Sequence, residues 1–209
     1  MIKSKICGIS DLDVLKYIIG HKYHPSFIGF ICNYKKSKRF VNFKKLKKLT
    51  SIKKKKLSYV AVLVKPSDNF LDKIKDLNFD YYQLYNVTPE QTKSIKDKYN
   101  KKIITSLTIK NKNDVEKYKS YIDISDIFNF DGSGYEKSIG FDHSLLKDLP
   151  SSINKMIAGN FKPEDNFRLY KNRFSFIDIS GGVESKNGIK DKEKINRFLI
   201  NINKTNDES

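Results

Sequence analysis

Cys7 is the first residue of this chain that could do acid–base chemistry. It ends the apolar run Lys3–Cys7, and the alternation of side chains along a strand places it on the same face as Lys5. A thiol can act as a general base when its pKa falls toward neutrality, and a neighbouring ammonium favours the thiolate. Cys32 follows a second apolar run without an adjacent glycine, and we expect it to be inert.

A carboxylate in front of a glycine-rich segment is a candidate general acid. Asp131 ends a later apolar run and precedes Gly132-Ser133-Gly134, a segment that could cover a site. Asp126 lies earlier in the same run and is the alternative acid. We favour Asp131 because it directly precedes the glycine-rich turn.

Three further segments could bind anions. Arg39 lies in the cationic segment 34–40, and its planar guanidinium matches a carboxylate. The small residues of Ala158-Gly159-Asn160 and Ser180-Gly181-Gly182 leave backbone N–H groups accessible, as phosphate sites require. These residues together predict a site with two anion-binding ends.

Strands must position these residues, and the sequence contains eight short apolar runs separated by eight stretches of helical periodicity. The expected strands are Lys3–Cys7, Ser26–Ile31, Ser58–Val64, Tyr81–Tyr85, Lys102–Leu107, Ile122–Phe130, Ile153–Ala158 and Ser175–Ile179. The expected helices lie near Leu12–Ile19, Asn42–Leu49, Asp68–Leu77, Pro89–Tyr99, Asn113–Tyr118, Ser144–Lys147, Pro163–Tyr170 and Asp191–Ile202.

Strands that alternate with helices predict parallel pairing with right-handed crossovers. Eight such units in about 200 residues predict an α/β fold, a single-domain (βα)8 TIM barrel. We expect the barrel to span residues 1–203 and a polar tail to occupy 204–209. A doubly wound open sheet is the alternative, although it usually has fewer strands at this length. In a barrel the loops after the carboxyl ends of the strands carry the chemistry, and the candidate residues lie at such ends.

The composition excludes several other classes of protein. The chain has 209 residues with a net charge of +17, and 38% hydrophobic and 12% aromatic residues provide enough core to exclude wholesale disorder. No apolar run approaches the length of a membrane span, and the N-terminus does not resemble a signal peptide. Two cysteines without a cysteine–histidine cluster predict neither a disulfide framework nor a metal site, and we expect a cytoplasmic location.

The positive charge is concentrated between Lys35 and Lys56, where 12 of 22 residues are basic and none is acidic. Such a run could bind nucleic acid or an anionic membrane. Phe43, Leu46 and Leu49 recur at helical spacing, however, which predicts the solvated face of an amphipathic helix. Only four of the 41 basic residues are arginine, which specific nucleic-acid readers use for bidentate contacts. We therefore expect neither nucleic acid nor a membrane as a partner.

The motifs resemble those of one family, the phosphoribosylanthranilate isomerases of tryptophan biosynthesis. The resemblance covers nearly the whole chain in order. It rests on Lys5–Ile9, Gly29-Phe30 with Tyr34–Phe40, Gln83-Leu84, Phe141-Asp142, Asp178–Glu184 and Gly188–Asp191. The resemblance implies a (βα)8 isomerase without a cofactor, monomeric or homodimeric, that acts on a small molecule carrying a carboxylate and a phosphate.

The family catalyses an Amadori rearrangement of N-(5-phosphoribosyl)anthranilate to 1-(2-carboxyphenylamino)-1-deoxyribulose 5-phosphate. The resemblance implies that Cys7 is the general base, that Asp131 is the general acid, and that Arg39 binds the anthranilate carboxylate. It implies further substrate contacts from Gln83 and Asp178. The residues that it implies for the phosphate are Gly159, Asn160, Ser180, Gly181 and Gly182.

Three positions depart from the family pattern, and the loop after Asp131 is shorter. Tyr85 stands where the family usually has His, Asn160 where it has a second Gly, and His143 where it has Trp. The related isomerase of histidine biosynthesis is the nearest alternative, but it uses Asp as the first-strand base. It also has a second phosphate site, and segments 64–67 and 85–88 lack the glycines of such a site. A catalytically inactive basic barrel that binds nucleic acid is the alternative from another class.

Overall fold

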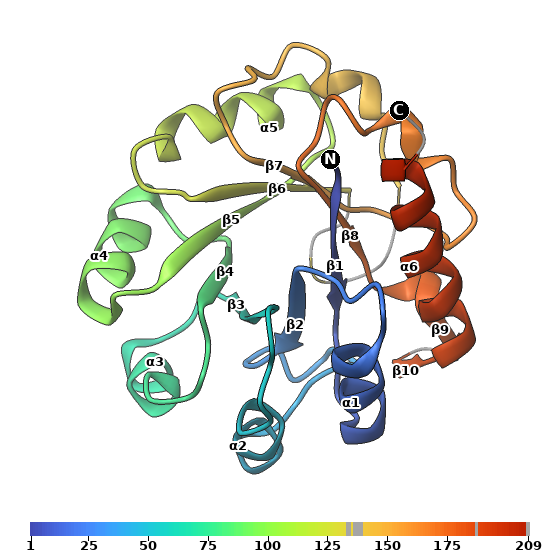
Figure 1. Cartoon of the computed structure of the whole chain (residues 1–209). Coiled ribbons are helices and arrows are strands. Elements are labelled where there is room, and N and C mark those ends of the chain that lie inside the picture. The colour runs from blue at the N-terminus through green and yellow to red at the C-terminus, as the bar shows by residue number, and fades with distance from the viewer. Residues whose placement is uncertain (133–134, 136–139, 187, 208–209) are drawn as a thin grey trace.

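The computed structural model describes residues 1–132, 135, 140–186 and 188–207 (Figure 1). Within these residues, eight parallel strands pair in chain order, and β1 pairs with β8 to close a barrel. The strands are β1 Lys3–Cys7, β2 Phe27–Ile31, β3 Ser58–Val64, β4 Tyr81–Tyr85, β5 Lys102–Thr108, β6 Ile127–Asp131, β7 Lys155–Ile157 and β8 Phe176–Ile179. The predicted TIM barrel is confirmed.

Helices surround the barrel (Figure 1). The α-helices are α1 Leu12–Gly20, α2 Phe43–Thr50, α3 Asp68–Ile74, α4 Pro89–Tyr99, α5 Lys112–Glu116 and α6 Lys192–Asp207. Short 3-10 helices are η1 Lys117–Tyr121, η2 His143–Leu146, η3 Phe167–Leu169 and η4 Gly181–Val183, and a hairpin of β9 Glu184–Lys186 and β10 Ile189–Lys190 follows η4. The crossovers after β6 and β7 thus carry 3-10 turns in place of the predicted α-helices, because three or four helical residues are too few for a stable α-helix.

α2 shows why the basic run forms a helix. Asn42 caps its N-terminus by accepting a hydrogen bond from the backbone N–H of Lys45. Leu46 and Leu49 are buried, whereas the lysines of the helix are exposed. The amphipathic interpretation of this segment is therefore confirmed.

The start of β6 differs from the prediction. Residues 122–125 continue the turn of η1, since the N–H groups of Ile124 and Ser125 donate to the carbonyl of Tyr121. Ile122 is 45% exposed and does not belong to the sheet. Its alternation with polar neighbours imitates a strand, so the prediction began five residues too early.

α6 extends further than the prediction. It continues to Asp207, and Thr205 in its last turn is buried. The side chain of Asn206 accepts a hydrogen bond from the N–H of Ile2 at 2.8 Å and donates one to the carbonyl of Ile2 at 2.9 Å. The expected tail at 204–209 is thus corrected, because these contacts hold the last turn against the start of β1; residues 208–209 lie outside the described part of the chain.

The barrel interior contains a polar layer between apolar ones. Phe27, Val60, Ile104, Ile127, Met156 and Phe176 belong to one buried apolar cluster inside the barrel. Lys5, Gln83, Ser106, Asn129 and Asp178 are buried polar residues on the same strands. A polar interior just below the strand ends must be hydrogen-bonded to be stable, and it supports the site above it.

No helix among the residues described here is long and apolar enough to cross a membrane.

Candidate active site

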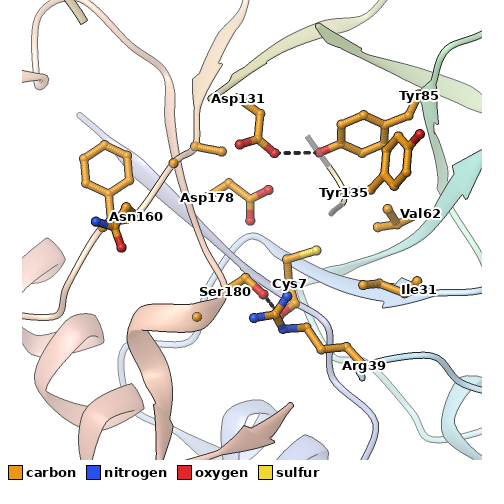
Figure 2. A pocket seen from close by; sticks show the side chains of 14 residues that line it. Cys7, Ile31, Arg39, Val62, Tyr85, Asp131, Tyr135, Asn160, Asp178 and Ser180 are labelled. Carbon is orange, nitrogen blue, oxygen red and sulfur yellow. Dashed lines mark hydrogen bonds between the residues drawn. The ribbon is translucent and has the colours of Figure 1, made fainter. Parts of the chain in front are cut away.

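A pocket at the carboxyl ends of the strands collects most of the predicted site residues (Figure 2). Its described lining consists of Cys7, Ile31, Arg39, Val62, Tyr85, Asp131, Tyr135, Ala158, Gly159, Asn160, Phe161, Asp178, Ser180 and Gly181. Gln83 and Gly182 are not among these lining residues. The other predicted residues, from the ends of β1, β6 and β8 and from the loops after β2, β7 and β8, therefore meet in one place.

Cys7 and Lys5 point into the barrel from β1, as the strand alternation predicts. Nζ of Lys5 lies 2.7 Å from Oδ2 of Asp178, and both side chains are buried. Burial raises the pKa of the Cys7 thiol, and the Lys5 ammonium lowers it by less. The pKa of Cys7 therefore lies above its ordinary value, with the Lys5 ammonium as the main group that favours the thiolate.

Asp178 presents one unsatisfied acceptor to the site. Burial raises its pKa, and the ion pair with Lys5 opposes that effect. Oδ2 is held by Lys5, while Oδ1 is buried and has no hydrogen-bond partner among the described residues. A buried acceptor without a partner is costly, so Oδ1 is ready to accept a hydrogen bond from a ligand hydroxyl.

Asp131 and Asp126 lie at opposite ends of β6. Asp131 ends the strand and lines the pocket with 8% exposure. Asp126 precedes the strand, accepts a hydrogen bond from the N–H of Ile103 at 2.7 Å and pairs with Lys96 at 3.2 Å. Of the two alternative acids, only Asp131 is a pocket residue. Ser133 and Gly134 of the predicted covering loop lie outside the described residues.

The side chain of Tyr85 contacts the candidate acid. Its hydroxyl donates a hydrogen bond to Oδ2 of Asp131 at 3.0 Å (Figure 2). Gln83 lies below the pocket, and its amide nitrogen is 3.3 Å from the hydroxyl of Tyr85 and 3.0 Å from Oγ of Ser106. Gln83 is fully buried and supports Tyr85 from this layer, while its predicted contact with substrate stays a prediction.

Arg39 is held in the pocket by Glu184. Nε and Nη2 of Arg39 lie 2.6 and 3.1 Å from the two carboxylate oxygens of Glu184. Gly8 makes room for this arginine, because a Cβ at residue 8 would lie 2.5 Å from Cδ of Arg39 and φ there is +78°. The arginine that was expected to bind a carboxylate thus already has an internal carboxylate partner.

Lys190 is the second cation on Glu184. Its Nζ lies 2.7 Å from Oε1 of Glu184 and 2.9 Å from the carbonyl of Ser180. Burial lowers the pKa of Lys190 to about 8, although Glu184 opposes this. Burial also raises the pKa of Glu184, but the hydrogen bond from Arg39 and the charge of Lys190 outweigh it and bring the pKa to about 2. Two cations around one carboxylate leave a net positive charge beside the loop of Ser180.

Two small-residue loops form the other side of the pocket. Gly159 and Asn160 have φ values of +111° and +54°, so the departure from glycine at 160 is accommodated in the left-handed region that asparagine tolerates. A Cβ at Gly182 would lie 1.9 Å from the carbonyl oxygen of Phe161. Gly182 is therefore needed for the close packing of the two loops and does not line the pocket itself.

His143 supports the loop after β7 from behind. Its ring lies 4.8 Å from Phe141, 5.5 Å from Phe161 and 5.5 Å from Tyr170, between ring centroids. Nδ1 is 2.8 Å from the hydroxyl of Tyr170. Burial lowers the pKa of this imidazole, which is therefore a neutral packing residue near pH 7.

Sequence reasoning missed four residues that complete this site. Glu184 and Lys190 belong to the motif Asp178–Asp191, but no spacing rule shows that they pair with Arg39. Tyr85 was noted only as a departure, although it lies at the end of β4. Tyr135 packs against Tyr34 and Tyr85 with centroid distances of 4.7 and 5.5 Å.

No group of three histidine, cysteine, aspartate or glutamate residues within the described ranges could hold a metal ion.

The sequence matches a family model over most of its length. That model, described as N-(5′-phosphoribosyl)anthranilate (PRA) isomerase, matches residues 4–201. N-(5′-phosphoribosyl)anthranilate isomerase of Rhizobium rhizogenes is 33% identical over 93% of this chain and 91% of its own length. The enzyme of the same name from Clostridium acetobutylicum is 32% identical over 98% of this chain and 99% of its own.

Solved structures show the same fold. Phosphoribosyl anthranilate isomerase from Thermotoga maritima superposes with a TM-score of 0.85 at 24% identity, covering 98% of this chain and 100% of that one. A phosphoribosyl anthranilate isomerase in complex with reduced 1-(o-carboxyphenylamino)-1-deoxyribulose 5-phosphate gives 0.84 at 23%, with the same coverage. A third structure, of monomers generated from the dimeric Thermotoga maritima enzyme, gives 0.82 at 22%, again with that coverage.

Proposed function

Since the chain belongs to the N-(5′-phosphoribosyl)anthranilate isomerase family and is an isomerase of tryptophan biosynthesis, we propose that Cys7 is its general base and Asp131 its general acid. The observation that carries this proposal is that both side chains line one pocket, together with Arg39 and the two small-residue loops that could bind anions. Cys7 ends β1 and Asp131 ends β6, and in the view of Figure 2 Asp178 lies between them.

The proposed roles follow the order of proton transfers. Asp131 protonates the ring oxygen of the furanose, the C1–O bond breaks, and the substrate opens to a Schiff base. Cys7, as the thiolate, then removes the proton from C2 of the sugar, which gives an enolamine that tautomerises to the ketose. Because the acid and the base are both held in place beside the bound substrate, each proton transfer takes place within one complex. Neither transfer then requires a separate collision with an acid or base from solution.

Anion binding at two ends would hold the substrate during these steps. We assign the phosphate to the backbone of Gly159, Asn160, Ser180 and Gly181, beside the buried ammonium of Lys190. Arg39 retains N–H donors beyond the two that Glu184 accepts, and these would meet the anthranilate carboxylate. Oδ1 of Asp178 would accept a hydrogen bond from a sugar hydroxyl. Binding energy from both ends then supports the chemistry between them.

A turnover assay tests the activity directly. Purified protein mixed with phosphoribosylanthranilate generated in situ should consume the fluorescence of the anthranilate group without any added cofactor. Equivalently, the gene should rescue a tryptophan auxotroph that lacks the isomerase. No turnover between pH 6 and 9 would contradict the proposal.

Two further properties are proposed, the compartment and the oligomeric state. Both cysteines are free thiols, and the proposed base must remain reduced, which favours a reducing compartment such as the cytoplasm. The chain is expected to be a monomer or a homodimer. Sedimentation at several protein concentrations would distinguish the two.

A further inference from the structure

We propose that Tyr85 is a positioning residue for the general acid: its hydroxyl, held in place by two buried amides, orients the carboxyl group of Asp131 toward the substrate. This inference rests on the proposed role of Asp131 and extends it to a residue that departs from the family pattern. Figure 2 shows the Tyr85 ring lying at the edge of the pocket with its hydroxyl aimed at Asp131.

The hydrogen bonds around Tyr85 favour donation from its hydroxyl to Asp131. The amide nitrogens of Gln83 and Asn129 lie 3.3 and 3.4 Å from the hydroxyl oxygen, and an amide N–H can only donate. Two donors occupy the two lone pairs of the phenol oxygen. Its single hydrogen is then directed at Oδ2 of Asp131, 3.0 Å away.

The strand register makes this network rigid. Tyr85 is the register partner of Ser106 on β5, and Ser106 is the partner of Asn129 on β6. Oγ of Ser106 accepts hydrogen bonds from Gln83 at 3.0 Å and from Asn129 at 3.2 Å, so the two amides are held as well. Asp131 lies two residues beyond Asn129 on the same face of β6, within reach of the hydroxyl.

Tyr85 remains a neutral donor over the working pH range. It is 4% exposed, and burial followed by the charge of Asp131 raises its pKa well above the ordinary value. Cys7 on β1 and Asp178 on β8 are the other titratable groups that act on it, with Lys5 paired to Asp178. The ring of Tyr135 packs against that of Tyr85 in a T-shaped arrangement.

A fixed neutral donor on Oδ2 has two consequences for an acid. It limits rotation of the carboxyl group, which keeps the proton-bearing oxygen aligned with the ring oxygen of the substrate. It also stabilises the carboxylate that forms when the proton leaves, which lowers the pKa of Asp131 relative to a site without the donor. Both consequences act on the proton-transfer step and neither requires contact between Tyr85 and the substrate.

The test is Tyr85→Phe, which removes the hydroxyl and retains the ring. We expect kcat to fall about 10- to 100-fold, the range for loss of one hydrogen bond to a charged group, while KM changes less than about twofold. The pKa that Asp131 contributes to the pH profile of kcat, identified as the one that disappears in Asp131→Asn, should move to higher pH.

Tyr82→Phe is the matched control. Tyr82 lies on the same strand, and its buried hydroxyl has no hydrogen-bond partner among the residues that the structure describes. Its ring belongs to the core outside the barrel, so kcat and the pH profile should match the wild type. Circular dichroism and thermal unfolding of both variants would show whether either change alters folding.

The outcomes separate this inference from the proposed function. Wild-type kcat and an unshifted profile in Tyr85→Phe, with Asp131→Asn inactive, would overturn the role of Tyr85 and leave that of Asp131 intact. Wild-type activity in Asp131→Asn would overturn the role of Asp131 first. If Tyr85 acts through Asp131, adding Tyr85→Phe to Asp131→Asn should cause no further loss of the residual rate. A full additional loss would contradict the proposal.

Discussion

Glu184 holds Arg39 at two points, with Nε at 2.6 Å and Nη2 at 3.1 Å from its carboxylate oxygens. The two residues are separated by 145 positions in the chain. The pair aligns one edge of the guanidinium with the loop after β8 and directs the rest of it into the pocket. A carboxylate that serves the protein in this way presets the orientation of the arginine before any ligand arrives.

Glu184→Gln should therefore weaken substrate binding more than it slows the chemistry. The neutral amide lacks the negative charge that pairs with both Arg39 and Lys190. We therefore expect KM to rise about tenfold and kcat to fall less than about threefold. The pKa of Glu184 is about 2, so the carboxylate itself does not titrate between pH 5 and 9. Glu184 also raises the pKa of Lys190, so the loss in Glu184→Gln should be larger at the alkaline end of this range. Steady-state kinetics at several pH values would measure this.

Glu164→Gln is the control for that change. Glu164 pairs with Arg197 at 2.8 Å, but both side chains are more than half exposed, and such pairs contribute little. Its kinetic constants should equal those of the wild type. An unchanged KM in Glu184→Gln would show that Arg39 does not depend on the pair.

Cys7→Ser should remove most of the activity, because a hydroxyl is a far poorer base than a thiol. We expect kcat to fall at least about a thousandfold with a small change in KM. Cys32→Ala is the comparison, since Cys32 is buried in the core outside the barrel and hydrogen-bonded to the carbonyl of Phe30. It should lose stability while keeping kcat, and a Cys7→Ser variant with wild-type rates would place the base elsewhere.

Lys5 opposes the effect of burial on the pKa of Cys7, and the sign of its contribution can be measured. The ammonium favours the thiolate, so Lys5→Met should move the pKa of Cys7 further above its already raised value. The thiolate absorbance of each protein, corrected with its Cys7→Ser counterpart, reports this titration. A shift of the Cys7 titration to lower pH in Lys5→Met would refute the assignment.

Asp131→Asn and Asp126→Asn should separate catalysis from stability. Asp131→Asn removes the proposed proton donor and should reduce kcat about 100- to 10,000-fold. Asp126→Asn weakens contacts to Ile103 and Lys96 at the other end of β6, and we expect a loss of about 1 kcal/mol in the free energy of unfolding with kcat retained. Kinetics and urea unfolding of both variants, measured together, would show the reverse pattern if Asp126 were the acid.

The lowered pKa of Lys190 leads us to expect that anion binding depends on pH. Its pKa is about 8, so the ammonium loses its proton as the pH rises through that value and its positive charge beside Ser180 is lost. The Kd of the reduced product analogue should increase about three- to tenfold between pH 7 and 9.5. Calorimetry of the wild type and of Lys190→Arg, which keeps its charge, tests this; a flat Kd in the wild type would contradict it.

The sequence predicts the strands well because their signal is local. A buried parallel strand is a continuous apolar run, and Ser58–Val64 and Tyr81–Tyr85 were placed to the residue. The crossovers after β6 and β7 were predicted less well, since short 3-10 turns lack a distinct periodicity. The start of β6 was predicted too early because Ile122 fits an alternating pattern. The pattern does not show that this isoleucine is exposed.

The candidate site could be predicted in part. Residues at strand ends are brought together by the barrel itself, so Cys7, Asp131 and Arg39 could be grouped once eight βα units were counted. Which side chains of the site form hydrogen bonds with one another depends on the distances between them. The sequence does not contain those distances. The bonds of Tyr85 to Asp131 and of Glu184 to Arg39 therefore required the structure.

The closure of the barrel has a consequence for synthesis on the ribosome. β1 pairs with β8, and Ile2 is hydrogen-bonded to Asn206 in the last turn of α6. Until β8 has been synthesised, β1 therefore has one edge without its partner strand. An unpaired strand edge is a template for pairing with another chain, so the long sequence separation between β1 and β8 exposes the folding chain to such pairing.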